Sequence, residues 1–219
     1  MKRLIISGIA IIAALMGTVN ASAQVYDGPR FGIIGGITSS SSTLKNVDAK
    51  SLFLYHAGLT AELPIGLGFA IQPSLEYQVK GVAADKIGDS SVNDVVNGFE
   101  AKAGFIEVPV QIQWGPDLVA FRPYAFAEPF VGYRIGGKAS SDGKYDWSAF
   151  TNDLKKIEYG LGVGAGIDIW KLQVSAKYFW NFGEMGAAGS GSDAVSTVKN
   201  TFKDGNNFNG IIFSLAFFF

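Results

Sequence analysis

The stretch that decides the fold is the last one, Phe208–Phe219, which reads FNGIIFSLAFFF. Every second residue from Ile211 to Phe219 is large and apolar, whereas the interleaved residues are mostly small or weakly polar, apart from Ile212 and Phe218. A period of two is typical of a β-strand. An apolar ribbon at an open sheet edge promotes aggregation, whereas a closed barrel in lipid has no edge and needs an apolar outer face. Taken alone, the stretch fits either such a barrel or the core strand of a soluble sandwich.

Seven further segments alternate in the same way, and most reach the ~9–11 residues that a tilted membrane-spanning strand needs. They are Phe31–Thr38, Phe53–Pro64, Phe69–Gly81, Phe99–Trp114, Phe121–Ile135, Ile157–Trp170 and Leu172–Gly183. The connections between the eight segments are alternately long and short, as are the external loops and periplasmic turns of outer-membrane barrels. The long ones are Ser39–Leu52, Val82–Gly98, Gly136–Lys156 and Glu184–Asn207, and the short ones are Ile65–Gly68, Gly115–Ala120 and a tight turn near Lys171. An even number of strands would return the C-terminus to the periplasmic side.

The charged side chains of the expected spans all fall on the face opposite the apolar one. They are Glu62, Glu76, Lys80, Glu107, Arg122, Glu128, Arg134, Glu158, Asp168 and Lys177. Glu100 and Lys102 share the apolar parity, and we place them above the membrane. A soluble lipocalin-like barrel would carry its charges outside, whereas a charge facing lipid near mid-membrane costs roughly 2–4 kcal/mol. We therefore predict an all-β fold: a single-domain, eight-stranded antiparallel transmembrane β-barrel, an up-and-down meander with short periplasmic turns and long extracellular loops.

The inward charges are predicted to form a network of ion pairs that plugs the barrel. The interior of an eight-stranded barrel is just wide enough for its own side chains, and removing one partner of a buried ion pair costs ~3–5 kcal/mol. Arg122 and Arg134 are expected to pair with Glu107, with Glu128 or with acids on neighbouring strands, and Glu158 is a candidate for Arg134. The alternative is a narrow ion or proton path along the same residues.

The N-terminus and the composition indicate an exported protein. A basic start, an apolar stretch over Leu4–Met16 and the small residues Ala21-Ser22-Ala23 form the three parts of a secretory signal peptide. The apolar stretch is shorter than the ~17–25 residues that a membrane helix needs. We expect removal of residues 1–23, which leaves residues 24–219 as a barrel in the outer membrane of a Gram-negative cell. The chain has no Cys and carries 18 Lys and Arg against 19 Asp and Glu, a balance that argues against nucleic acid as a partner.

Five groups of short motifs in the mature chain resemble those of a known family. They are Phe31-Gly32-Ile33 with Gly35-Gly36, His56-Ala57-Gly58-Leu59, Ile71-Gln72-Pro73 with Tyr77 and Lys80-Gly81, Glu107-Val108-Pro109, and Arg122-Pro123-Tyr124 with Glu128-Pro129. Their order and spacing are similar to those of the outer-membrane β-barrel domain family abundant in Bacteroidetes, described as PorT-like or OmpX-like. The similarity covers essentially the whole mature chain, with a departure at Glu128, a position that is commonly Gly in the family. The resemblance implies a small barrel and brings no set of catalytic residues.

The last strand also resembles the C-terminal signal that the barrel-assembly machinery reads in bacterial outer-membrane barrels. Its apolar positions are Phe213, Leu215, Phe217 and Phe219. The other expected partners are outer-membrane lipid and an extracellular partner bound through the loops. In the third long loop, Trp147, Phe150 and Leu154 have helical spacing, so they are either a contact patch for such a partner or residues that pack over the barrel mouth.

His56, the one His of the chain, is the candidate for catalysis. It points inward near the extracellular end of its strand, and some small outer-membrane enzymes act on lipid with His and Ser or Asp. No Ser/His/Asp order and no G-x-S-x-G elbow accompanies His56. We therefore expect no catalytic residue, cofactor or metal site, and a structural, adhesive or surface-interaction role. The alternatives are a narrow channel and a lipid-modifying enzyme that uses His56.

Gly160, Gly162, Gly164 and Gly166 alternate along the sixth expected strand and face inward. A nucleotide-binding loop would need a following helix, which this pattern lacks. The glycines are instead expected to make room for large inward rings on neighbouring strands. Those rings are Tyr124, Phe126, Phe130 and Phe179.

Overall fold

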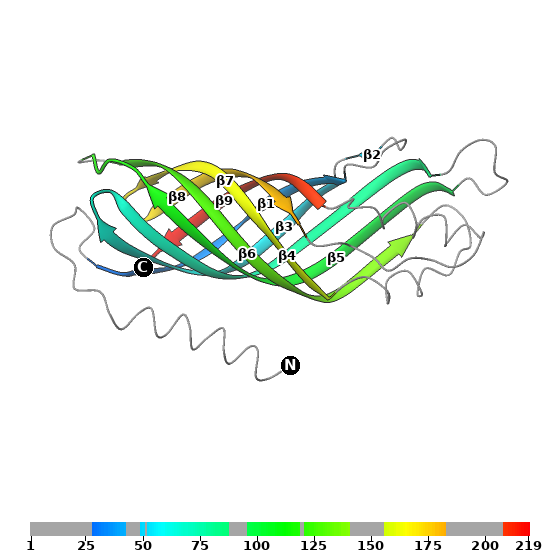
Figure 1. The fold of residues 1–219 in the computed structure, drawn as a ribbon, viewed down its shortest axis with the longest axis horizontal. Coiled ribbons are helices and arrows are strands. Elements are labelled where there is room, and N and C mark those ends of the chain that lie inside the picture. The colour runs from blue at the N-terminus through cyan, green and yellow to red at the C-terminus, as the bar shows by residue number, and fades with distance from the viewer. Residues whose placement is uncertain are drawn as a thin grey trace.

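Eight long antiparallel strands form a closed barrel, which Figure 1 shows from the side. The structure, a computed structural model, describes residues 28–42, 49–50, 52–87, 96–118, 121–140, 156–182 and 208–219. The long strands are β1 (Arg30–Ser42), β3 (Leu52–Gly66), β4 (Phe69–Ile87), β5 (Val96–Trp114), β6 (Arg122–Ser140), β7 (Ile157–Ile169), β8 (Leu172–Asn181) and β9 (Phe208–Phe218). Each pairs with the next along the chain, and β9 pairs with β1 to close the barrel. The predicted eight-stranded antiparallel meander is confirmed.

The two ends of the barrel differ in the length of their connections. At one end, here called the turn end, short segments join the strands: Leu67–Gly68, residues 115–121 and Trp170–Lys171. The other end, the loop end, holds the four long connections and the short strand β2 (Ala49–Lys50), which pairs with β4. No helix among the described residues is long and apolar enough to cross a membrane.

The connections at the turn end are short, as predicted, although some boundaries differ: β6 begins at Arg122, one residue later than expected, and β3 ends later. β3 runs on to Gly66 through an irregular register after Pro64, so the turn to β4 is shorter than expected. Leu67 and Trp170 both adopt left-handed backbone conformations, with φ of 56° and 54°. Gly68 also has positive φ, and its Cβ position lies 2.4 Å from the carbonyl oxygen of Gly115, so this turn leaves no room for a side chain there.

Several strands extend farther at the loop end than predicted: β1 continues to Ser42 through residues expected to be loop, and three neighbouring strands have longer extensions. β4, β5 and β6 each have 19 residues, and they include residues 82–87, 96–98 and 136–140, which were expected to be loop. Backbone pairing continues to the end of the β4–β5 hairpin, where Ile87 lies opposite Val96. Beyond the lipid a strand needs no apolar outer face, so its alternating pattern fades although its pairing continues. In Figure 1 the extended part of β4 and β5 projects at the right-hand end.

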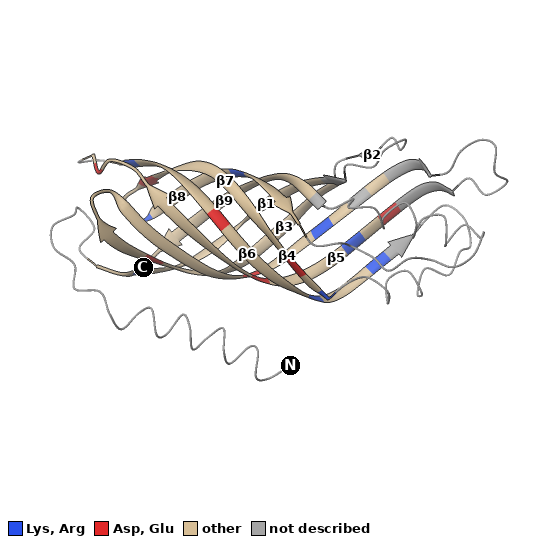
Figure 2. Ribbon diagram, viewed as in Figure 1, with Lys and Arg blue, Asp and Glu red and all other residues tan. Residues whose placement is uncertain are grey.

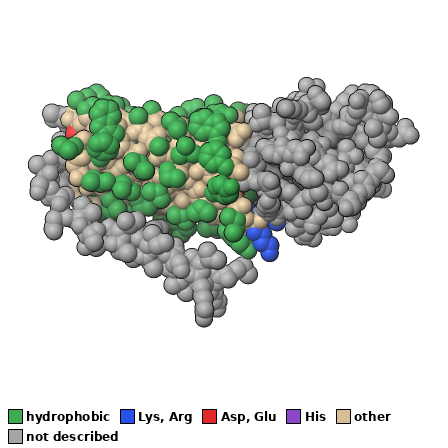
Figure 3. Space-filling view, viewed as in Figure 1, with side chains coloured by type: hydrophobic (Ala, Val, Ile, Leu, Met, Phe, Trp, Pro, Cys, Tyr) green, Lys and Arg blue, Asp and Glu red, His purple; other side chains and the backbone are tan. Residues whose placement is uncertain are grey.

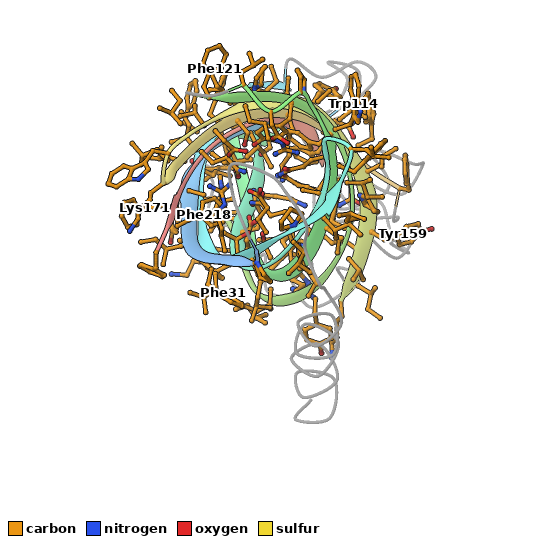
Figure 4. All side chains as sticks on the ribbon, turned by 90° about the vertical axis from the view of Figure 1, so that its left-hand side faces the viewer. Phe31, Trp114, Phe121, Tyr159, Lys171 and Phe218 are labelled. Carbon is orange, nitrogen blue, oxygen red and sulfur yellow. The ribbon has the colours of Figure 1, made fainter. Side chains whose placement is uncertain are left out.

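The barrel wall separates an apolar outer face from a polar interior. On β8 the outward Val174 and Tyr178 are 49% and 41% exposed, whereas the inward Gln173 and Phe179 are each 1% exposed. Figure 3 shows hydrophobic side chains over the described part of the outer face. Figure 4, viewed from the turn end, shows nitrogen and oxygen atoms gathered inside the ring of strands. This is the orientation predicted for a barrel in lipid.

Aromatic rings line both rims of the apolar face. Near the turn end, the rings of Phe69 and Trp114 lie 6.5 Å apart, centroid to centroid. Near the loop end, the rings of Tyr55 and Tyr77 lie 6.2 Å apart. Trp114 and Tyr159, both exposed, point outward from the ring of strands in Figure 4. Aromatic rings at two levels mark the two membrane–water interfaces.

The glycines of β7 make room for rings on β6, as predicted. The opposite pairs are Tyr124 with Gly166, Phe126 with Gly164 and Phe130 with Gly160. A Cβ atom at Gly164 would lie 2.2 Å from the carbonyl oxygen of Ala176 and 2.6 Å from Cζ of Phe126. Gly162 is different, because its nearest neighbour would be Cδ of Lys177 at 3.4 Å. The interior is therefore close-packed at Gly164 and has space at Gly162.

This difference between two glycines of one strand can be tested directly. Gly164→Ala is expected to lower the free energy of unfolding by about 1–3 kcal/mol, because the new methyl group overpacks against the β8 backbone and the Phe126 ring. Gly162→Ala is the matched control and should change it by less than about 0.5 kcal/mol. Urea unfolding in lipid vesicles measures both values. Equal effects of the two substitutions would contradict the described packing.

Candidate functional site

The candidate site is the polar interior of the barrel together with its two rims. Nine of the ten charged residues predicted to face inward are buried. They are Glu62, Glu76, Lys80, Glu107, Arg122, Glu128, Glu158, Asp168 and Lys177. The tenth, Arg134, is half-buried near the loop end. Because six different strands supply these residues, their pairing depends on the closed structure and not on neighbours along the chain.

Arg122 is the centre of a cluster at the turn end. Its Nη1 atom lies 3.0 Å from Oδ2 of Asp168 and 3.9 Å from Oε1 of Glu62, and its Nε atom lies 3.4 Å from Oδ1 of Asp117. Its Nη2 atom donates to the carbonyl oxygen of Gly68 over 3.1 Å. One guanidinium therefore binds acids from three segments and the turn between β3 and β4, which ties this end of the barrel together.

Arg30 joins the same cluster from β1. Its Nη2 atom lies 2.6 Å from Oε2 of Glu62 and 3.7 Å from Oδ2 of Asp168. Its Nη1 atom donates to the carbonyl oxygen of Trp170, and its guanidinium lies 4.3 Å from the centre of the Phe218 ring. Phe218 is the inward exception that the sequence shows in the last strand, and stacking on Arg30 accounts for it.

A layer of glutamines crosses the barrel next to this cluster. Gln72 on β4 and Gln173 on β8 exchange two hydrogen bonds, of 3.0 and 2.9 Å. Four strand pairings separate β4 from β8 in either direction, so these side chains meet from opposite walls. Gln113 donates to Gln72 over 2.6 Å and to Gln111 over 2.9 Å. The amide layer therefore spans the full width of the lumen.

The middle of the barrel holds an ion pair between Lys177 on β8 and Glu128 on β6. Gln111 donates to the second carboxylate oxygen of Glu128 over 2.8 Å, which links this pair to the glutamine layer. Lys177 passes over Gly162 of the intervening strand, where a Cβ atom would make ordinary van der Waals contact with its Cδ atom at 3.4 Å. Glu128 therefore has a specific partner in this chain.

Near the loop end, Lys80 lies between two carboxylates. Its Nζ atom is 2.8 Å from Oε1 of Glu107 and 3.1 Å from Oε1 of Glu158. Asn181 donates to the other oxygen of Glu158. Gly132 lies between the two acids in the sheet, and a Cβ atom there would be 2.8 Å from Oε1 of Glu158. A side chain at that position would force the carboxylates away from Lys80.

Three aromatic rings enclose the same ammonium group. The Nζ atom of Lys80 lies 4.4 Å from the centre of the Phe130 ring, 4.9 Å from that of Phe179 and 5.6 Å from that of Phe105. Ring faces attract a cation, and more strongly where water is excluded. Lys80 is 1% exposed, so the rings and the two acids replace its hydration.

One of the expected pairings is wrong, and that of Arg122 holds only in its broader form. Glu158, the expected candidate for Arg134, bonds instead to Lys80 and Asn181. Arg122 binds neither Glu107 nor Glu128. The acids that Arg122 binds are Asp168, Asp117 and Glu62. Asp168 lies on β7, next to β6, which agrees with the broader expectation of an acid on a neighbouring strand. The reason is position along the barrel axis, because Arg122 begins β6 at the turn end whereas Glu107 lies opposite Gly132, ten residues farther along β6.

His56 lies inside the barrel against β9. Its Nε2 atom is 3.1 Å from Oγ of Ser214, and both residues are buried. Its Nδ1 atom has no hydrogen-bond partner among the described residues, so no described acid orients the imidazole as a triad requires. No group of three or more His, Asp and Glu among the described residues could hold a metal ion.

The remaining predicted sites lie on the outside or beyond the described residues. Phe213, Leu215, Phe217 and Phe219 point outward along the last strand and are exposed. Trp147, Phe150 and Leu154 lie outside the described part of the chain.

A family model for the outer membrane protein beta-barrel domain matches residues 20–185. The chain belongs to this family. The closed barrel, its polar interior and its apolar outer face are therefore those of an outer-membrane β-barrel protein. The match to the outer membrane protein beta-barrel domain does not separate a PorT-like from an OmpX-like member, so that finer resemblance stays a prediction.

Two solved structures of outer-membrane barrels are similar to the chain at low identity. One is Ail, the attachment invasion locus protein of Yersinia pestis, in complex with the heparin analogue sucrose octasulfate, with 12% identity, a TM-score of 0.43, and coverage of 88% of this chain and 99% of that one. The other is a major outer membrane protein from Thermus thermophilus, with 12% identity, a TM-score of 0.44, and coverage of 87% and 99%. None of the curated proteins matches the chain.

The glutamine layer is a part of the site that sequence reasoning missed, although its signal is present. Gln72, Gln111, Gln113 and Gln173 all occupy inward positions of their strands. In an outer-membrane barrel, neutral amides at inward positions are candidates for a bonded layer because each can both donate and accept.

The central ion pair leads to a prediction about stability. Lys177→Met is expected to destabilise the barrel by about 3–5 kcal/mol, because it leaves the Glu128 carboxylate buried without its partner. Adding Glu128→Gln should recover much of that loss, and a double-mutant cycle over urea unfolding measures the coupling. Lys171→Met, at the turn-end rim beside Trp170, is the control and should lower the free energy of unfolding by about 0–1 kcal/mol. Additive effects of the two interior substitutions would contradict the pairing.

Proposed function

We propose that this outer-membrane protein is non-enzymatic, and that its barrel, closed by its own side chains, anchors a structural or surface-interaction role at the loop end. The observation that carries the proposal is the pair of hydrogen bonds between Gln72 and Gln173, which join opposite walls of the barrel. A pore would need a continuous path past this layer. The interior of an eight-stranded barrel is filled by its own side chains, as the close contacts here illustrate.

The layers above and below the glutamines support a closed interior. Arg122 fills the turn end with bonds to three acids. Lys80 reaches from β4 to Glu158 on β7, three strand pairings away. Both layers hold a cation against several anions, an arrangement that resists hydration because these charges already have partners.

The interior also supports a role without catalysis. His56 and Ser214 form the one contact among the described residues that resembles part of a hydrolytic site, but both are buried in the lumen. A lipid-modifying enzyme needs its catalytic groups where lipid can reach them, and the outer face of the barrel is apolar. The contact is better explained as a structural hydrogen bond between β3 and β9 across Gly36 of β1.

The orientation in the membrane is part of the proposal. The signal peptide at residues 1–23 would export the chain, and the turn end would face the periplasm as short turns do in this class of barrel. The long connections would then lie outside the cell. In an adhesive role, an extracellular partner would bind to these connections. The PorT-like resemblance alone does not establish a part in secretion.

Single-channel recording of the refolded protein in planar bilayers tests the closed interior. The wild type is expected to show no stable ion-selective openings. Gln72→Ala/Gln173→Ala should produce more frequent brief openings, because the bridge across the lumen is lost, whereas the outward Val174→Ala should remain silent. Large, stable, ion-selective openings of the wild type would replace the proposal with the channel alternative. Lipid turnover by the wild type that is lost in His56→Ala would replace it with the enzyme alternative.

The C-terminal strand provides a test of assembly. Phe219 is 72% exposed on the outer face, so replacing it leaves the interior unchanged. Phe219→Asp is expected to reduce insertion in cells and leave periplasmic aggregate, because the barrel-assembly machinery would read this residue. Heat-modifiable migration on gels measures the folded fraction, with Phe219→Leu as the control that retains an apolar terminus. Normal yield of the Asp variant would show that the machinery does not need this residue.

A further inference from the structure

A β-bulge at the loop end changes the direction of the side chains that follow it on β6. Phe105 pairs with Arg134 and Gly104 with Gly136, so Ile135 is an extra residue without a partner on β5. Below the bulge the odd-numbered residues of β6, such as Val131, face outward. Beyond it the parity reverses, and Lys138 lies directly opposite the outward Lys102 of β5. The extra residue is the reason why a lysine that simple alternation assigns to the inside faces outward.

The lysine pair lies just beyond the aromatic rim of the barrel. The outward Tyr77 of β4 covers Gly104, where a Cβ atom would lie 2.7 Å from its Oη atom. Lys102 is the next outward residue of β5 after Gly104, and a strand rises ~3.3 Å per residue. The lysine backbone is therefore roughly 7 Å farther along the strand than the ring level, which marks the membrane–water interface, and about 5 Å higher because barrel strands tilt by ~35–45°. Long lysine stems reach back from this height to lipid headgroups.

The two lysines carry the same charge and therefore repel each other. Like charges directly opposite in a sheet destabilise it, and Lys102 and Lys138 are both exposed on one face. Glu100, two residues along β5, forms an ion pair with Lys102. Among the residues that the structure describes, this is the one ion pair that either lysine forms. Figure 2 shows blue segments side by side on neighbouring strands where β4, β5 and β6 extend past the rest of the barrel.

We propose that Lys102 and Lys138 form a binding site for the phosphate group of an anionic lipid at the loop-end rim. A phosphate offers several acceptor oxygens and can lie between two ammonium groups. Its negative charge would remove their mutual repulsion, and the acyl chains of the same lipid would pack on the apolar face below Tyr77. The proposal rests on insertion of the barrel in a membrane and is independent of whether the interior is closed.

The decisive measurement is the thermal stability of Lys102→Gln, Lys138→Gln and the double variant in two kinds of nanodisc. In pure phosphatidylcholine, Lys138→Gln should raise the melting temperature or leave it unchanged, because it removes the repulsion and keeps the ion pair between Lys102 and Glu100. In phosphatidylcholine containing phosphatidic acid, each substitution should lower it, because the bridging phosphate is lost. Lys171→Gln, which lies over Trp170 at the opposite rim, is the control and should not change sign between the two lipids.

A binding titration separates the lipid from a free anion. The affinity of the detergent-solubilised protein for phosphatidic acid should fall about five-fold for each lysine removed, the equivalent of the roughly 1 kcal/mol that a lysine contributes at an anionic lipid surface. Heat-modifiable migration verifies that each variant folds. Equal affinity of the wild type and the double variant for phosphatidic acid would overturn the proposal. So would equal stabilisation of the wild type by inorganic phosphate in neutral lipid, because the site would then bind a free anion.

Discussion

A polar side chain that faces the lumen of this barrel must find its hydrogen-bond and ion-pair partners among the other groups that face the lumen. The rest of the structure depends on that constraint. Gln72 meets Gln173 from the opposite wall, and Lys80 reaches Glu158 across three strand pairings. Such bonds exist only in the closed form, so opening one strand pair would leave several buried polar groups without partners at once. The cost of unsatisfied groups in a poorly hydrated interior makes closure cooperative.

The strands also complement one another in side-chain volume inside the barrel. β6 supplies large rings and β7 supplies glycines directly opposite them, so one wall fills the volume that the other leaves empty. Around Lys80, the rings of Phe130 and Phe179 also contribute attraction for the ammonium group. An apolar ring beside a charge would ordinarily oppose burial, but a ring face turned toward a cation partly replaces its water. Packing and electrostatics therefore support the same arrangement.

The function of this barrel depends on where its polar groups can be reached. The polar groups of the interior bond to one another, and the outer face is apolar. The polar groups that a ligand or partner can reach therefore lie at the two rims and the loop end. Membership of the outer membrane protein beta-barrel domain family fixes the architecture without fixing an activity, because one fold carries many functions. The β-bulge at Ile135 matters for this reason, since it places Lys138 on the accessible side.

The sequence by itself determined the barrel, its eight strands and the face to which each charge of the spans belongs. A period of two is a local property of the chain, and the need to keep charge out of lipid acts on every strand separately. Only the tertiary structure decided the partners. Arg122 binds Asp168 and Asp117 and not Glu107, and Glu158 binds Lys80 and Asn181, because pairing depends on height along the axis and on register between strands. The register is changed by a single extra residue in β6, which strict alternation cannot reveal and which backbone pairing with β5 alone defines.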